Sequence, residues 1–174
     1  MKKIEIDVFS SESIENAIKQ LDSYAKEIER KTELLRIKVA ERIATEVEIG
    51  FRMAITSDMV KGSPPPNDTS VYVRNEGNTS VIVANGTQIM WIEFGAGVYH
   101  NGSVGSSPHP KGSELGMVIG GYGKGRGKRR VWGYVESEGD ELKLTRGTPA
   151  QMPMLKAVNT VLNEIPDIAR EVFK

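Results

Sequence analysis

Cysteine is absent from this 174-residue sequence, and histidine occurs only twice. Without cysteine, the chain has no disulfide framework, no thiolate metal site and no cysteine nucleophile. The two histidines, His100 and His109, stand nine residues apart in a stretch rich in glycine and serine, without the i, i+4 spacing of helical metal ligands. We therefore expect solvated loop histidines and no metal site.

Long apolar runs are also absent. No segment approaches the ~18 consecutive apolar residues of a membrane span, and the opening residues MKKIEID alternate instead of forming the apolar run of a signal peptide. Lys plus Arg and Asp plus Glu each number 23, so the chain as a whole is not a polyanion binder. These features predict a protein kept on the soluble side, whose contacts with nucleic acid, if it makes any, are local.

The usual signatures of catalysis and nucleotide binding are missing as well. The stretch GGYGKGRGKRRVWGY, residues 120–134, suggests phosphate binding, but Arg129 stands where a phosphate-binding loop needs Ser or Thr. Arg126 stands where a dinucleotide-binding motif needs its third glycine. No Gly-x-Ser-x-Gly nucleophile elbow is present. We predict that the protein is not an enzyme and binds no cofactor.

Basic residues are concentrated in and before this glycine-rich stretch. Residues 98–130 have no clear periodicity, which predicts a flexible insert. Glycine removes side-chain bulk, and the cations can meet phosphates or an acidic protein surface. The prediction is an interaction loop that contacts DNA or a protein neighbour, and the alternative is a solvated loop. The basic residues assigned to this loop are Lys111, Lys124, Arg126, Lys128, Arg129 and Arg130.

Periodicity predicts a single α+β domain that spans residues 1–174 and begins with a long helix. The alternation of Ile4, Ile6 and Val8 predicts a short strand before it. Residues 11–49 contain no Gly or Pro and carry an apolar stripe, which predicts one helix of about 40 residues, or two that meet near Thr32. So long a helix projects from its domain or spans it, and its stripe is covered by a partner subunit or by the chain's own sheet.

The rest of the chain predicts a small antiparallel sheet and a C-terminal amphipathic helix. Residues 88–94 are apolar and short, and fit a strand or one helical turn. Apolar residues at helical spacing follow Pro153, and Pro166 is expected to kink or restart that helix. Two hairpins are predicted: residues 71–75 with 80–84, and residues 130–135 with 141–146.

Two segments carry a resemblance to a known family. They are MWIEFGAG, residues 90–97, and GTPAQMPMLKA, residues 147–157, which leads into the last helix. Together with the order of elements, they resemble the neck and tail-completion family of long-tailed bacteriophages and prophages. The insert between the segments is longer and richer in glycine than in compact family members, so the position within the neck stays open. The residues assigned to the family motifs are Trp91, Glu93, Phe94, Gly95, Pro149, Gln151 and Pro153.

The resemblance implies a virion structural protein without catalytic activity. Such a protein is assembled in the bacterial cytoplasm and acts at the head–tail junction. It is a subunit of a homo-oligomeric ring, a hexamer or dodecamer, that connects the portal and adaptor proteins to the tail tube or terminator. The glycine-rich insert would contact a neighbouring subunit, the portal side, the tail tube or DNA in the lumen. The alternatives are a tail-terminator subunit and a separate nucleic-acid-binding protein that uses the basic loop.

The motif residues also have plain structural roles. We expect Glu93 to cap the last helix or to pair with Arg146. Gly95 or Gly97 is expected to end its element with a positive φ angle, and Pro153 to start the last helix. The apolar members expected in the core are Trp91, Ile92 and Phe94.

Overall fold

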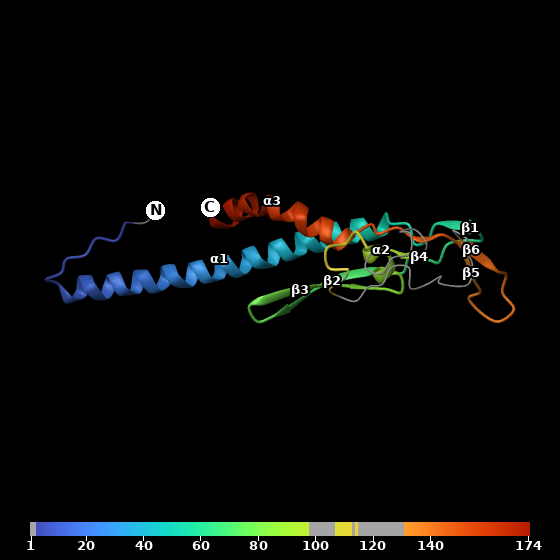
Figure 1. Ribbon diagram of the computed structural model, residues 1–174. Coiled ribbons are helices and arrows are strands. Elements are labelled where there is room, and N and C mark those ends of the chain that lie inside the picture. Colours follow the sequence, from blue (N-terminus) through green and yellow to red (C-terminus); the bar gives the residue numbers. More distant parts are fainter. Residues whose placement is uncertain (1–2, 98–106, 113, 115–130) are drawn as a thin grey trace.

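The computed structural model has an α+β fold with a long N-terminal helix, small antiparallel sheets and a C-terminal helix (Figure 1). The N-terminal helix projects well beyond the rest of the molecule. The strands and the short helix gather around its C-terminal end. The residues that the structure describes are 3–97, 107–112, 114 and 131–174.

Helix α1 runs without a break from Ser11 to Arg52, as one of the two sequence alternatives predicted. Ser10 is its N-cap, and the Ser10 hydroxyl accepts a hydrogen bond from the backbone N–H of Ser13 at 3.2 Å. The strand predicted at residues 4–8 is wrong, because no strand in the described part of the chain pairs with this segment. The end of this segment is instead bonded to helix α1: the backbone N–H of Asp7 donates a hydrogen bond to the hydroxyl of Ser13 at 2.8 Å.

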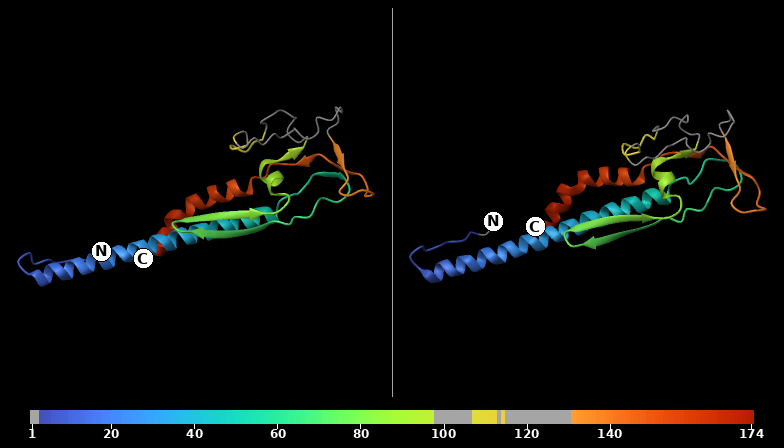
Figure 2. Two further views of the ribbon diagram at one scale, coloured as in Figure 1. Left: turned by 90° about the horizontal axis from the view of Figure 1, so that it is seen from below. Right: turned by 60° about the horizontal axis from the view of Figure 1, so that its bottom comes forward.

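Helix α3, Pro153–Phe173, packs against the C-terminal half of α1. Arg42 of α1 donates to Glu164 of α3 at 2.8 Å, and this hydrogen bond, together with one to Glu46, raises the pKa of Arg42 above its ordinary value. Pro166 does not end the helix, which continues to Phe173 and bends along its length (Figure 2). The bend is expected of a proline, which removes one backbone hydrogen bond and crowds the preceding turn.

In the part of the chain that the structure describes, seven short strands and one further helix accompany α1 and α3. Strands β2 and β3 form the first predicted hairpin, in which Ser70 pairs with Asn85 and Glu76 with Thr79. Strands β5 and β6 form the second, and β1 adds to the free edge of β6. The bounds are β1 Met59–Lys61, β2 Ser70–Glu76, β3 Thr79–Asn85, α2 Ile89–Phe94, β4 Ala96–Gly97, β5 Trp132–Tyr134, β6 Lys143–Thr145 and β7 Gly147–Thr148.

The hydrophobic core lies where α1, α2 and α3 meet. Side chains of the β2–β3 hairpin cover it from one side, and Ile43 and Met154 border it. The core therefore uses only the C-terminal end of α1 and leaves the N-terminal half of that helix outside it. Its buried members are Val47, Phe51, Ile89, Ile92 and Ala157.

Helix α1 approaches the start of α3 closely at Gly50. A Cβ atom placed on Gly50 would lie 2.8 Å from the Cβ atom of Pro153, closer than real Cβ atoms approach.

We expect Gly50→Ala to lower the free energy of unfolding by about 1–2 kcal/mol, even though alanine favours a helix over glycine by ~1 kcal/mol. Urea denaturation measures the change. Ser23→Ala, at an exposed position of the same helix, is the control and should not destabilise. A stabilised Gly50→Ala variant would contradict this packing.

Candidate functional site

The two family-like motifs meet in one junction. The first motif forms α2 and β4, and the second forms β7 and the start of α3. Strands β4 and β7 pair antiparallel, so that Ala96 lies opposite Thr148. Beyond this pairing, the backbone N–H of Gln151 donates to the carbonyl oxygen of Ile92 at 2.8 Å. Segments more than fifty residues apart in the sequence therefore form a continuous unit.

Glu93 caps helix α3 from the middle of α2. Its Oε2 accepts from the backbone N–H of Met154 at 2.9 Å, and its Oε1 accepts from that of Leu155 at 3.2 Å. These are among the N–H groups that a helix leaves unpaired in its first turn, where a carboxylate is also favoured by the helix dipole. The N-cap residue Met152 provides no side-chain acceptor, so Glu93 performs the capping from a distance. The first of the two predicted roles of Glu93 is confirmed.

The alternative partner of Glu93, Arg146, lies elsewhere. Its guanidinium pairs with the carboxylate of Asp58 at 3.2 Å. Gly95 does end α2 with a φ angle of 83°, as expected for one of the two glycines. Pro153 is the first residue of α3, where a fixed φ angle and a missing N–H have no cost.

His109 is the second buried partner of Glu93. Its Nε2 lies 3.2 Å from Oε1 of Glu93, and its Nδ1 accepts the backbone N–H of Lys111 at 3.1 Å, which assigns the proton to Nε2. The imidazole ring lies 4.4 Å from the ring of Phe94. The expectation of a solvated histidine is therefore wrong for His109, and His100 lies outside the described residues. The sequence carries no local signal of this pair, because the two residues lie on different segments.

Ser107 fastens the same turn to α2. Its hydroxyl donates to the carbonyl oxygen of Phe94 at 2.7 Å and accepts the backbone N–H of His109 at 3.2 Å. Together with the Glu93–His109 contact, this hydrogen bond holds residues 107–112 against the motif junction. The described part of the insert is thus anchored on the same carboxylate that caps α3.

Gln151 joins the junction to the end of α1. Its amide nitrogen donates to the carbonyl oxygen of Ile55 at 2.8 Å, and its amide oxygen accepts the backbone N–H of Ile55 at 2.9 Å. The amide of Gln151 thus pairs with both the N–H and the C=O of one residue, as a neighbouring β-strand would. The next residue, Met152, has φ 54°, an uncommon left-handed conformation for a residue other than glycine. The hydrogen bonds of Gln151 thus fix the second motif next to a residue whose left-handed backbone conformation is intrinsically unfavourable.

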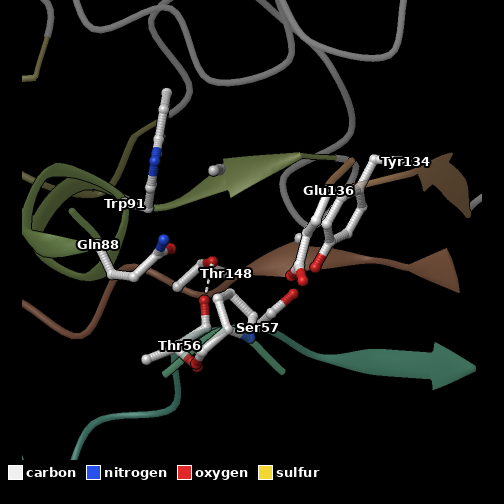
Figure 3. A pocket seen from close by; sticks show the side chains of 10 residues that line it. Thr56, Ser57, Gln88, Trp91, Tyr134, Glu136 and Thr148 are labelled. Atoms are coloured by element: carbon white, nitrogen blue, oxygen red, sulfur yellow. Dashed lines mark hydrogen bonds between the residues drawn. The ribbon is translucent and has the colours of Figure 1, made fainter. Parts of the chain in front are cut away.

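A cleft of about 280 Å³ lies beside the junction, between α2 and the β1–β6–β5 sheet (Figure 3). Trp91 and Tyr134 stand on opposite sides of it, and Thr148 lies between them, where its hydroxyl donates to the carbonyl oxygen of Thr56 at 2.7 Å. Trp91 is only partly buried and borders this cleft. The prediction of a core tryptophan is therefore corrected, whereas Ile92 and Phe94 are buried as expected.

Glu93 and His109, at the centre of the junction, are each held by several contacts. The oxygens of Glu93 accept two backbone N–H groups, Nε2 of His109 lies 3.2 Å from one of these oxygens, and Nδ1 of His109 accepts the backbone N–H of Lys111. These contacts give Glu93 the capping role and hold His109 in place beside it. Among the residues that the structure describes, no group of three or more His, Asp or Glu side chains could hold a metal ion.

The basic loop is described only at its first cation. Lys111 is exposed and follows the turn that His109 anchors. The remaining basic residues of the prediction lie outside the described residues: Lys124, Arg126, Lys128, Arg129 and Arg130.

A further exposed surface, apart from the junction, is the apolar stripe on the projecting half of α1. Its members step by four, three, four and three residues, so they share one face of the helix. The sequence predicts this stripe. The structure shows that the stripe is exposed here, whereas apolar residues further along the same helix, such as Val47 and Phe51, are buried. The stripe consists of Ile14, Ile18, Leu21, Ala25 and Ile28, of which the four larger residues are 39–55% exposed.

Comparisons with protein-family models, with curated proteins and with solved structures found no significant match to this chain. In the part of the chain that the structure describes, no helix combines the length and the apolar character needed to cross a membrane.

Proposed function

We propose that the protein is a virion structural component of the head–tail junction of a long-tailed bacteriophage or prophage, in the neck or tail-completion position. In this proposal it is a subunit of a homo-oligomeric ring that connects the portal and adaptor proteins to the tail, and it carries out no catalysis. Its partners are further copies of itself and the neighbouring proteins of the neck and tail.

The observation that carries the proposal is the meeting of the two family-like motifs. A chance resemblance of two short segments gives no reason for them to touch. Here Glu93 of the first motif caps the helix that Pro153 of the second begins, and Gln151 bonds to the backbone of Ile92. The motif residues thus act together, as parts of one architectural unit.

The shape of the molecule adds a second support. A helix of 42 residues that leaves the body with its apolar stripe exposed is costly for a monomer, because exposed apolar surface favours association. Ring subunits need such surfaces on two sides, since each copy contacts two neighbours. The exposed stripe is consistent with a subunit that buries this surface against another subunit when it assembles.

Electron microscopy of the purified protein tests the proposal, alone and after mixing with a portal–adaptor complex. We expect rings of uniform diameter, or rings that form on the portal–adaptor complex and extend it along its axis. The portal–adaptor complex without the protein is the control for particle length. A chain that stays a monomer at all concentrations and never joins the complex would overturn the proposal.

A further inference from the structure

We propose that the N-terminal segment of one copy adds as a strand to the outer edge of β2 in a neighbouring copy. The segment is residues 3–7, and it runs antiparallel to residues 72–76 of that neighbour. This inference rests on the self-association that the proposed function requires, and it names a contact between subunits. It gives the apolar alternation of the N-terminal segment a partner strand, which the described part of its own chain does not provide.

Residues 3–7 belong to no helix or strand of the subunit. Figure 1 shows them leaving the far end of α1, away from the core, and Ile6 is 50% exposed. The backbone of Asp7 is used within its own chain, where its N–H donates to Ser13 and its C=O accepts from Ser10. Among the described residues, no hydrogen bond engages the backbone of residues 3–6. The backbone groups of Ile4 and Ile6 are therefore free to bond to a partner strand.

The hairpin of β2 and β3 has an edge that can accept such a strand. It is a sheet of two strands, and in the described part of the chain no strand pairs with the outer side of β2. The turn that includes Gly77 pairs Glu76 with Thr79, and hydrogen-bonded pairs alternate from there along the hairpin. The backbone N–H and C=O groups of Val73 and Asn75 consequently point out of the hairpin. An exposed strand edge of this kind is a template for a further strand.

The charged residues of the two strands are complementary in one antiparallel register. This register pairs both charges of residues 72–76 with opposite charges, and the third charge of the N-terminal segment lies opposite a tyrosine. Arg74 and Glu76 pair with each other in the subunit, but both side chains are more than half exposed, and such ion pairs are weak. The opposed residues are Lys3 with Glu76, Glu5 with Arg74, and Asp7 with Tyr72.

Other registers match the charges less well. A shift of the segment by two residues keeps its isoleucines on the same face of the sheet. A shift in one direction brings Lys3 against Arg74, and a shift in the other brings Glu5 against Glu76. Like charges directly opposite each other destabilise a strand pair. A parallel arrangement gives at most one pair of opposite charges.

The isoleucines of the segment lie on the inner face of the hairpin in the antiparallel register. Ile6 lies opposite Val73, and Val73 pairs with Ile82, which packs against the core. Ile4 lies opposite Asn75. These two positions are also the ones at which backbone groups point outward from β2, so both strands present their unused hydrogen-bonding groups to each other. Main-chain hydrogen bonds with alternate side chains on either face are the usual basis of strand addition.

The segment cannot reach the hairpin of its own chain. Nη1 of Arg36 donates to Oδ1 of Asn75 at 3.2 Å, which places the end of the hairpin beside the middle of α1 (Figure 2). Helix α1 begins at Ser11, about 38 Å of helix before Arg36. Asp7 precedes Ser11 by only four residues, a reach of at most about 14 Å. The strand contact therefore requires a second copy.

The contact joins two unlike surfaces. A pair of copies joined in this way leaves one N-terminal segment and one β2 edge unoccupied, so a third copy can add in the same manner. Such head-to-tail association closes into a ring when the rotation between copies allows it.

Disulfide cross-linking tests the register, and the absence of native cysteine makes it specific. Glu5 and Arg74 form a pair without backbone hydrogen bonds, in which the Cα atoms lie about 4.5 Å apart, a separation that a disulfide spans. We expect the variant with both Glu5→Cys and Arg74→Cys to give covalent oligomers in denaturing gels after oxidation. Glu5→Cys combined with Val81→Cys is the matched control, because Val81 pairs with Arg74 from β3 and lies one strand further away.

The outcomes separate this inference from the proposed function. Cross-linking is measured on the assembly that electron microscopy shows, either a free oligomer or a ring on the portal–adaptor complex. If the Arg74→Cys pair cross-links no more than the Val81→Cys control, the strand contact is overturned and the ring is left. Equal cross-linking by Glu5→Cys or Arg74→Cys alone also overturns the contact, because like surfaces would then be paired.

Two further outcomes concern the ring. A largest covalent species of two subunits supports the strand contact, as a mutual exchange of segments, and overturns the ring. A protein that stays monomeric, both alone and with the portal–adaptor complex, overturns the contact and the ring together.

A second measurement avoids cysteine chemistry. Ile6→Pro removes a backbone N–H that this register directs at Val73, and we expect it to raise the concentration at which the oligomer dissociates by about tenfold or more. Lys3→Pro is the control, because the N–H of Lys3 points away from β2, and it should change that concentration by less than about threefold. Circular dichroism and urea denaturation check that both variants keep the helix content and the stability of the subunit. Equal effects of the two substitutions would overturn the contact.

Discussion

Replacing Glu93 by alanine is expected to lower the free energy of unfolding by about 2–4 kcal/mol. Glu93 is 3% exposed, and its carboxylate accepts hydrogen bonds from the backbone N–H groups of Met154 and Leu155. Its removal leaves the first turn of α3 without its cap and removes the carboxylate that lies 3.2 Å from the buried Nε2 of His109. Water cannot readily replace these contacts, so the loss exceeds that of an ordinary surface cap. Urea denaturation of the purified variant measures the change.

Two controls separate capping from a general loss of charge. Glu93→Gln keeps the shape and one acceptor oxygen but places an NH₂ group near a backbone N–H, so an intermediate loss is expected. Glu48→Ala removes an exposed partner of Arg52 and should change the free energy of unfolding by less than about 0.5 kcal/mol. If Glu93→Ala were no more destabilising than Glu48→Ala, the cap would contribute nothing measurable.

Phe51→Ala is expected to have the largest effect of any single substitution considered for this protein, a loss of about 3–5 kcal/mol. Phe51 is completely buried and packs with Val47, Ile92 and Ala157 in the core where α1, α2 and α3 meet. Truncation leaves a cavity that the surrounding helices cannot fill without moving. Its backbone carbonyl oxygen also accepts the amide of Asn67 at 2.6 Å, so movement of this turn disturbs the following loop. Thermal and urea unfolding both report the change.

Leu21→Ala is the informative comparison for Phe51→Ala. Leu21 continues the same apolar pattern along the same helix but is 53% exposed in the subunit. Its truncation should change subunit stability by less than about 1 kcal/mol, because little buried surface is lost and alanine favours a helix. We expect the cost to appear in self-association instead. A large loss of subunit stability would mean that the projecting half is buried by its own chain.

The long helix was predictable because its signal is local. Residues 11–49 lack Gly and Pro, Ser10 has an N-capping side chain, and the apolar stripe repeats at helical spacing. The hairpin of β2 and β3 was equally accessible, since alternation and turn residues lie within one short segment. The strand expected at residues 4–8 had the right alternation as well. It failed because a strand also needs a partner, which alternation does not provide.

The candidate junction was predictable only in part. The resemblance selected Glu93, Pro153 and Gln151, and the capping role of Glu93 was one of two alternatives. The burial of His109 and its contact with Glu93 could not be anticipated, because no spacing in the sequence relates a residue on α2 to one in the insert. The partial exposure of Trp91 was missed for the same reason, since the cleft beside it is made by distant strands.

The sequence by itself determined the two long helices, the two hairpins and the apolar stripes, because these depend on side chains within a few residues of one another. The tertiary structure alone decided which stretch of a stripe is core and which is surface. Leu21 and Val47 have the same kind of environment in the sequence, but α3 reaches only as far as Lys31. Burial depends on where a second element ends in space, and that distance is not encoded in the local pattern of either helix.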